Sequence, residues 1–403
     1  MSISALRTPN LVATIGYLAR WLPPLAAWVR WERQRRAAVA LQFYRDGNLS
    51  AALAQYREAL GWSPRDADLR AALGQVCYEL NQTEQAESQF RRALEYDYRN
   101  LRALQGLGNV LLDNGDLDGA MYHYLRYLEI RPKDAGVCLN LGVVFHNMGN
   151  FEKATLYYTQ AEEAAPADPL ALKNHALALF ALGRFPDAEA LLARAQTLAP
   201  ADGEIDLLQG QAREAHDDYQ GAAACYAAAL EKNPQDAQAH LRSAFVTGRL
   251  GRWPEAIRHS EHAVELYRQA DDAANGALAW WELGWAYYRA GEWQRSIEAS
   301  SESIKLDPKH AAVRFNRGLA LLHLGRGAEA RQEYVDGIGL VTQVAELKAH
   351  AIEDLSEALE QNPNLPGGAE ILDMLKQRYA AMSQELAKSA HRQASHSTDP
   401  TPP

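Results

Sequence analysis

One feature constrains the fold of this chain more than any other: a period of 34 residues. A small residue recurs at this interval through seven successive periods. The series is Ala40, Gly74, Gly108, Gly142, Ala176, Gly210 and Ala244. Twelve residues after each member stands an alanine, from Ala52 to Ala256. Strict self-similarity of this kind predicts a chain of tandem structural units rather than one ordinary globular core.

Each period has the pattern of two short helices. In residues 135–166, apolar residues at helical spacing precede a turn at Gly149, and a second such run ends at Pro166. Glycine suits the end of a helix, and proline lacks the amide hydrogen that a helix interior needs. The small residues let two helices approach closely, and a large residue fills the remaining space. The large residues are Tyr56, Phe90, Tyr124, Tyr158 and Tyr226. Such helices cannot bury their apolar faces alone, so the units are expected to stack.

This combination of period, small positions, aromatic position and proline resembles the tetratricopeptide repeat (TPR) family over about residues 33–334. The resemblance implies an all-α fold, a right-handed α-solenoid of about nine tandem helix-turn-helix repeats with helical caps. The sequence shows neither runs of alternating β-branched residues nor an alternation of strand and helix patterns, which agrees with an all-helical chain.

The 34-residue frame of the repeats divides the chain into segments. Seven repeats are expected over residues 33–270 and two more over residues 277–344. An insertion at residues 271–276 shifts the frame by six positions and is expected to form a loop. Residues 345–388 predict a degenerate repeat followed by a cap helix, because apolar residues keep helical spacing there. Residues 389–403 have little to bury and are expected to be disordered.

Residues 1–32 precede the frame. Their apolar and aromatic stretch, residues 11–31, is interrupted by Arg20 and by Pro23-Pro24. The uninterrupted pieces are shorter than the roughly 20 residues that a spanning helix needs. Three interpretations remain open. The stretch caps the first repeat, lies in a membrane interface through residues 11–36, or is a spanning helix or a cleaved signal.

Composition narrows the class of partner. The formal net charge is −10, whereas a protein that binds nucleic acid as its main partner needs a basic face, so no nucleic-acid partner is expected. The three cysteines, Cys77, Cys138 and Cys225, are far apart and follow no regular spacing. They are interpreted as packing residues in a reducing compartment. A cytoplasmic location is therefore predicted, with peripheral attachment to a membrane as the alternative.

No catalytic set is recognisable. The chain has no GxxxxGK[ST], HExxH or GxSxG motif, and its acids are scattered rather than paired. We therefore predict that the protein is not an enzyme and has no cofactor and no metal site. His259 and His262 lie one helical turn apart, but without a third ligand they are interpreted as part of a solvated helix face.

The resemblance also implies that the first helix of each repeat lines the inner, concave surface. In the third to fifth repeats, the inward positions predicted to line a binding groove are polar: Asn109, Asn140, Lys173 and Asn174. Family members that grip a peptide C-terminal carboxylate use a set of lysine, asparagine and arginine side chains. Here Gln105 and Leu170 stand where two of the lysines belong, so this ligand is not predicted.

The seventh to ninth repeats have a different set of inward residues, rich in aromatic and arginine side chains, with Arg314 and Arg317 nearby. The set is Phe245, Arg249, Trp281, Trp285, Tyr288, Arg289 and Phe315. Aromatic and arginine side chains dominate binding hot spots, so these residues are predicted to form a continuous partner-binding groove. The alternative is that they are packing residues at an atypical end of the array.

These observations together predict a non-catalytic scaffold or adaptor for protein–protein interaction. Its expected partner is a protein or peptide segment held in the concave groove. The alternative is a membrane-associated assembly or accessory factor that is anchored through its N-terminal segment.

Overall fold

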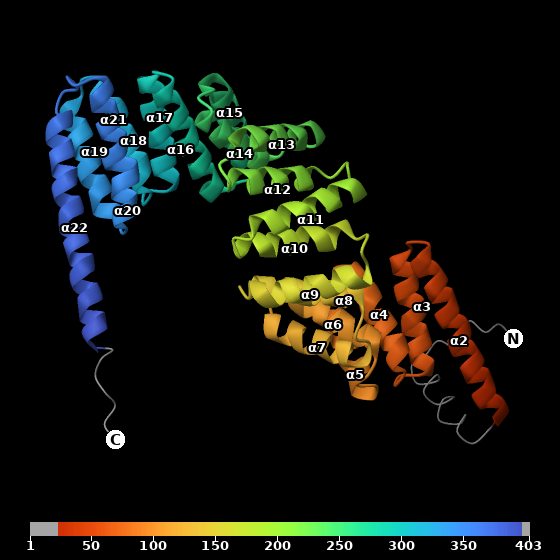
Figure 1. Cartoon of the computed structure of the whole chain (residues 1–403). Helices are drawn as coiled ribbons and strands as arrows, with labels where there is room; N and C mark the ends of the chain where they lie inside the picture. Colours follow the sequence, from red (N-terminus) through yellow and green to blue (C-terminus); the bar gives the residue numbers. More distant parts are fainter. Residues whose placement is uncertain (1–22, 397–403) are drawn as a thin grey trace, which may run out of the picture. The chain divides into compact units, whose positions relative to one another are not determined.

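The structure is a computed structural model that describes residues 23–396, with side chains described for residues 25–386 (Figure 1). Every element within this range is a helix, so the predicted all-α class is confirmed. The chain divides into two compact units, residues 1–199 and residues 200–403. Residues 1–22, which are most of the predicted N-terminal segment 1–32, lie outside the described residues.

The first unit consists of helices that pack in chain order. They are α2 (Pro23–Arg45), α3 (Leu49–Trp62), α4 (Ala67–Glu79), α5 (Thr83–Tyr96), α6 (Leu101–Asp113), α7 (Leu117–Ile130), α8 (Ala135–Asn147), α9 (Phe151–Ala164), α10 (Pro169–Ala181) and α11 (Phe185–Leu198). Each helix contacts the next, and α4, α6, α8 and α10 also contact one another in succession. First helices of neighbouring pairs therefore share one side of the stack.

The helices within the second unit also pack in chain order. Its helices are α12 (Gly203–Glu214), α13 (Tyr219–Lys232), α14 (Ala237–Arg249), α15 (Trp253–Gln269), α16 (Ala273–Arg289), α17 (Trp293–Leu306), α18 (Ala311–His323), α19 (Gly327–Leu340), α20 (Val344–Leu347), the π-helix η2 (Lys348–Glu353), α21 (Asp354–Gln361) and α22 (Gly368–His396). Here α14, α16 and α18 contact in succession as first helices.

Capping residues follow the same period as the small residues. The Oδ1 atom of Asp66 accepts a hydrogen bond from the backbone N–H of Leu69 at 3.1 Å, which satisfies one of the free amides at the start of α4. Equivalent side-chain caps begin the first helix of six successive pairs. They are Asp66, Asn100, Asp134, Asp168, Asp202 and Asp236.

The turns inside the pairs need a left-handed residue. Gly149 joins α8 to α9 with a φ of 74°, a conformation that costs glycine nothing. Where the period lacks glycine, Asn81 and Asp217 take its place, with φ values of 57° and 59°. Asp271, between α15 and α16, is also left-handed, with a φ of 54°. These short polar residues tolerate the left-handed region better than other side chains do.

An aromatic ring packed on a glycine closes most pairs. A Cβ atom built on Gly142 would lie 2.4 Å from the ring of Tyr158, which is 1% exposed. Gly108 faces Tyr124 and Gly210 faces Tyr226 in the same way. These contacts account for the recurrence of glycine inside helices, where it would otherwise cost stability.

The predicted loop at residues 271–276 is wrong. The six additional residues lengthen the flanking helices instead: α15 and α16 have 17 residues each, against 14 in α9. Asp272 caps α16 by accepting a hydrogen bond from the N–H of Asn275 at 3.0 Å. The connection therefore stays short. The eighth repeat, predicted to begin at residue 277, begins at Ala273.

The C-terminal region differs from a regular repeat. Residues 344–361 form one run of helix in which α20, η2 and α21 follow without a break. Ile371, Leu375 and Met382 on α22 are buried against this region. The prediction of disorder from residue 389 is wrong for residues 389–396, which belong to α22; residues 397–403 lie outside the described part.

Part of the N-terminal stretch belongs to the first helix pair. Helix α2 begins at Pro23, ten residues before the predicted frame, and the ring of Trp28 packs edge-on against Trp62 of α3 at 5.2 Å. Trp31 is 55% exposed. None of the described helices is both long enough and apolar enough to cross a membrane.

Candidate binding site

The polar set lies in the first unit, where two of its members bind each other. The Nδ2 atom of Asn140 donates to Oδ1 of Asn109 at 3.0 Å, and the hydroxyl of Tyr124 donates to the same oxygen at 2.7 Å. Asn109 therefore positions a core ring and links α6 to α8. Lys173 and Asn174 are half-buried on α10.

The aromatic set lies in the second unit, and most of it surrounds one cavity of about 530 Å³. Five of the predicted residues line this cavity: Phe245, Arg249, Trp281, Trp285 and Arg289. Tyr288 lines a smaller adjoining cavity of about 190 Å³ together with Trp285. We call the larger space the inner cavity.

Phe315 was predicted to line the groove, and this prediction is wrong. Its side chain is 0% exposed and stacks on Tyr334 of α19, with ring centroids 5.7 Å apart. It belongs to the same core cluster as Leu347 and Ala351 of the C-terminal region. The inward position on α18 is therefore used for packing.

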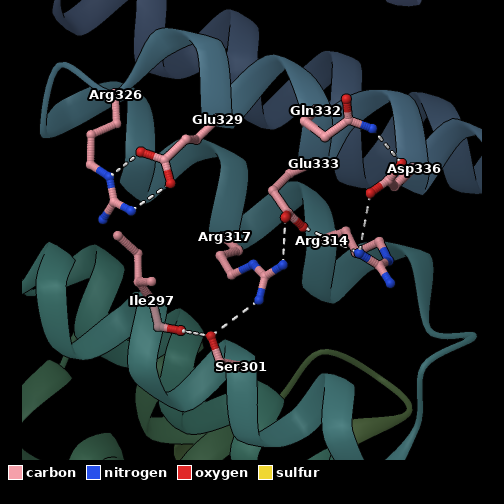
Figure 2. A network of polar contacts seen from close by, with 9 residues as sticks. All are labelled: Ile297, Ser301, Arg314, Arg317, Arg326, Glu329, Gln332, Glu333 and Asp336. Atoms are coloured by element: carbon pink, nitrogen blue, oxygen red, sulfur yellow. Dashed lines mark hydrogen bonds and ion pairs between the residues drawn. The ribbon is translucent and has the colours of Figure 1, made fainter.

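Arg314 and Arg317 do not line the inner cavity and instead bind acidic side chains of α19 (Figure 2). The guanidinium of Arg317 pairs with the carboxylate of Glu333 on α19 and donates to the Ser301 hydroxyl of α17 at 3.1 Å. Arg314 pairs with Glu333 at 3.5 Å and with Asp336 at 3.7 Å. These two arginines join α17, α18 and α19 and are structural.

The sequence did not predict one wall of the inner cavity, which comes from the C-terminal region. Ala349, His350 and Glu353 of η2 and Asp354 of α21 line it. The rings of His350 and Trp281 lie edge to face at 6.1 Å. Because the repeat frame decays after the ninth repeat, periodicity does not predict that this segment reaches α16. The sequence indicated only that this segment is helical, through the helical spacing of its small and apolar residues.

Aromatic rings contact both arginines that line the inner cavity. The guanidinium of Arg289 lies 5.2 Å from the ring centroid of Trp253 and 5.6 Å from that of Trp285. It also pairs with Glu357 of α21 at 3.4 Å. Arg249 lies over the ring of Tyr219 at 5.2 Å. Both cations, although exposed, therefore already lie against aromatic faces, which attract a guanidinium.

Two carboxylates at the inner cavity are harder to ionise than usual. Burial is the main cause that raises the pKa of Glu282 to about 7, and repulsion from Glu214 adds to it. Burial also raises the pKa of Asp354 to about 6, helped by the charges of Glu357 and Glu353 and opposed by Arg289. Both groups change charge close to neutral pH.

Two tetratricopeptide repeat models match the chain, one over residues 235–309 and the other over residues 78–135, 139–203 and 282–338. Together they cover more than half of it. The chain belongs to the tetratricopeptide repeat family. No curated protein matches it.

Solved TPR structures are similar to this one. A TPR protein from Parabacteroides merdae is 15% identical, with 62% of this chain and 99% of that chain covered and a TM-score of 0.50. The pilF protein of Pseudomonas aeruginosa is 22% identical, with 52% and 96% covered and a TM-score of 0.48. The Cut9–Hcn1 hetero-tetramer of the APC/C is 16% identical, with 85% and 76% covered and a TM-score of 0.48. At 15% identity, the likeness to the Parabacteroides merdae protein shows the TPR fold alone.

The TPR fold is typical of proteins that bind other proteins. Aromatic rings, two arginines and three carboxylates surround the inner cavity. Among the described residues, no group of three or more histidine, cysteine or acidic side chains could hold a metal ion.

The histidine pair His259 and His262 was interpreted as a solvated face, which is wrong for His259. Nδ1 of His259 lies 3.1 Å from Nδ1 of His240 on α14, and His262 stacks on His240 with ring centroids 4.9 Å apart. Burial lowers the pKa of His259 to about 4. Sequence reasoning missed His240 because it lies on the other helix of the pair.

Proposed function

We propose that this TPR protein is a non-catalytic scaffold that holds a protein or peptide segment at the inner cavity. The single observation that supports this most is the set of aromatic side chains left half-buried there. Phe245, Trp281 and Trp285 come from two helices and face one space of about 530 Å³. Aromatic side chains contribute large contact areas at interfaces, and burying one is worth about 2 kcal/mol.

The residues of the inner cavity contribute unequally to this function. Trp285 packs against the cluster of Leu347, Ala351 and Leu355, so its truncation would also weaken the core. Trp281 and Phe245 do not belong to the residues that pack on this cluster. We therefore expect Phe245→Ala and Trp281→Ala to weaken partner binding by about tenfold, equivalent to ~1.4 kcal/mol.

Site-specific crosslinking tests the proposal. A photoreactive benzoylphenylalanine at position 245 replaces one aromatic ring by another, and the same group at Glu298, an exposed position of α17, is the control. The proposal expects a discrete partner crosslinked at position 245 and not at position 298. Equal capture at both positions, or none at position 245, contradicts it. The captured partner then provides the ligand for affinity measurements on Phe245→Ala.

A second candidate function is attachment to a membrane through residues 11–36. Its support is Trp31, which is 55% exposed with the guanidinium of Arg35 lying 5.5 Å from its ring. Tryptophan beside basic residues is typical of interfacial helices. Co-sedimentation with vesicles that contain phosphatidylserine tests this function. Binding that high salt reverses and that Trp31→Ser with Arg35→Gln abolishes would support it, and unchanged binding in that variant would contradict it.

A further inference from the structure

The charges around the inner cavity are not balanced. Arg289 is held by Trp253, Trp285 and Glu357. Arg249 lies over the ring of Tyr219 at 5.2 Å, and Glu353 pairs with Lys348 at 3.6 Å. Among the described residues, neither Glu282 nor Asp354 has a hydrogen-bond or ion-pair partner for its side chain. Two carboxylates thus face the same space without a cation of their own.

The groups that surround these acids do not supply the missing charge. Glu282 faces Glu214 and Arg242, and Arg242 already pairs with Glu214 at 3.1 Å. Asp354 faces Glu353, Glu357 and the engaged Arg289. A partly buried carboxylate without a counter-charge is costly, and a cation brought by a ligand would remove that cost.

The walls suit a cation as well. Trp281 and Trp285 present ring surface beside the two acids, and Arg289 shows that the face of Trp285 accepts a guanidinium at 5.6 Å. Aromatic faces attract ammonium and guanidinium groups most strongly where water is displaced.

We propose that the inner cavity is a subsite for one lysine or arginine side chain of the bound segment, with Glu282 and Asp354 as its charge partners. This proposal rests on the proposed function, because it assumes that a peptide segment enters the cavity. The opposite ligand, an acidic side chain, would have to bind Arg249 and Arg289 and would face both unpaired carboxylates. Charge complementarity therefore favours the basic side chain.

The test uses the full chain labelled with 5-fluorotryptophan and three capped tripeptides, Gly-Lys-Gly, Gly-norleucine-Gly and Gly-Glu-Gly. Fluorine NMR follows the Trp281 and Trp285 signals, which Trp281→Phe and Trp285→Phe assign. We expect the lysine peptide to shift both signals and to bind about tenfold more tightly than the norleucine peptide. Stronger binding of the glutamate peptide, or equal binding of all three, overturns the proposal.

The pH dependence provides a second measurement. A cation binds the ionised carboxylates, so affinity for the lysine peptide should rise about tenfold between about pH 5.5 and about pH 8. The variant Glu282→Gln should lose this rise near pH 7 and keep a smaller one near pH 6 from Asp354. Glu298→Gln, an exposed acid on α17, is the matched control and should behave like the unchanged protein. A pH-independent affinity overturns the proposal.

The two proposals fail in different ways. If position 245 captures a partner but the lysine peptide shows no preference, the scaffold function stands and the basic subsite is overturned. If position 245 captures nothing and no peptide shifts the tryptophan signals, both are overturned. Circular dichroism of Glu282→Gln keeps the comparison valid, because this isosteric change should leave the helical content unchanged.

Discussion

Two helix pairs of this protein are closed in different ways. In the α8–α9 pair, the ring of Tyr158 lies directly on Gly142, and the nearest atoms to a Cβ on that glycine are all ring carbons. In the α16–α17 pair, Gly284 faces Ser300. Backbone atoms of Ser300 and Ser296 would lie 3.4 Å and 3.5 Å from a Cβ atom built on Gly284. The second pair therefore brings two backbones together where the first holds an aromatic ring between them.

The two pairs also differ in where their aromatic side chains lie. In the α16–α17 pair the large position inside the hairpin is a serine, and α16 carries Trp281 and Trp285 on the side that faces the inner cavity. The α14–α15 pair is intermediate: Ser260 takes the large position, and His240 and His259 pack together nearby. The two pairs whose large position is a serine, α14–α15 and α16–α17, are thus the pairs whose aromatic side chains line the inner cavity.

The largest effect is expected where a ring closes the pair. Tyr158→Ala removes a side chain that is 1% exposed and should lower the free energy of unfolding by about 3–5 kcal/mol. Tyr122→Ala, which truncates a ring 54% exposed on α7, is the control and should change it by less than about 0.5 kcal/mol. Hydrogen exchange of the α8–α9 amides measures the local opening. Similar effects of both variants would show that the internal ring is not what closes the pair.

Acid should open the α14–α15 pair selectively. His259 is half-buried beside His240, Arg258 and His262, and desolvation is the main cause that lowers its pKa to about 4. Because the unfolded chain binds a proton near the ordinary histidine pKa of about 6.5, stability should fall by about 2–3 kcal/mol as pH drops from about 6.5 to about 4. Hydrogen exchange across this range should rise in α14–α15 more than in α12–α13, which Tyr226 closes. His259→Gln should flatten the dependence, and an unchanged profile in that variant would contradict this assignment.

Alanine in place of each glycine sharpens the comparison. Gly142→Ala places a Cβ atom 2.4 Å from the Tyr158 ring and should cost about 1–3 kcal/mol, because the ring has no free space to move into. Gly284→Ala meets the Ser300 hydroxyl at 2.9 Å and gains helix propensity, so it should change stability by less than about 1 kcal/mol. Thermal melts of the two variants test this order. A larger loss from Gly284→Ala would mean that the α16–α17 backbones are the more rigid contact.

The smallest effects on stability are expected for two serines of α17. The buried Ser300 hydroxyl has no hydrogen-bond partner among the described residues, whereas Ser303 donates to the carbonyl oxygen of Ala277 at 2.7 Å. Ser300→Ala should therefore raise the stability of α16–α17 slightly and Ser303→Ala should lower it by about 1 kcal/mol. Opposite signs in chemical denaturation would confirm the difference, and a loss from both would indicate that Ser300 binds an ordered water.

Sequence reasoning was accurate where each repeat repeats the same local contacts. The small residues, the turn glycines and the internal rings predicted the helix pairs, because these contacts connect residues close in the chain. It was wrong at residues 271–276, where two helices lengthened, since periodicity alone does not distinguish a loop from additional helical turns. It assigned Phe315 to the groove for the same reason, because a frame position does not reveal that the neighbouring C-terminal region covers it.

The candidate site was only partly predictable. The inward positions of α14 and α16 pointed to Phe245, Arg249, Trp281, Trp285 and Arg289, which do line one cavity. The wall formed by η2 and Asp354 depends on contacts between residues far apart in the chain, and no repeat supplies a template for those. The partners of His259 and of Arg317 were missed likewise, since both belong to other helices.

The wall that η2 and α21 add has a consequence for the order of events during synthesis. Most of the repeats complete their contacts with immediate neighbours as the chain leaves the ribosome, but the inner cavity needs Phe245 and Asp354 together. Domains fold as they emerge, from the N-terminal side first. A nascent chain therefore exposes Trp281 and Trp285 uncovered until residues 344–361 follow, and during that interval its inner surface is open to chaperones rather than shaped for its final partner.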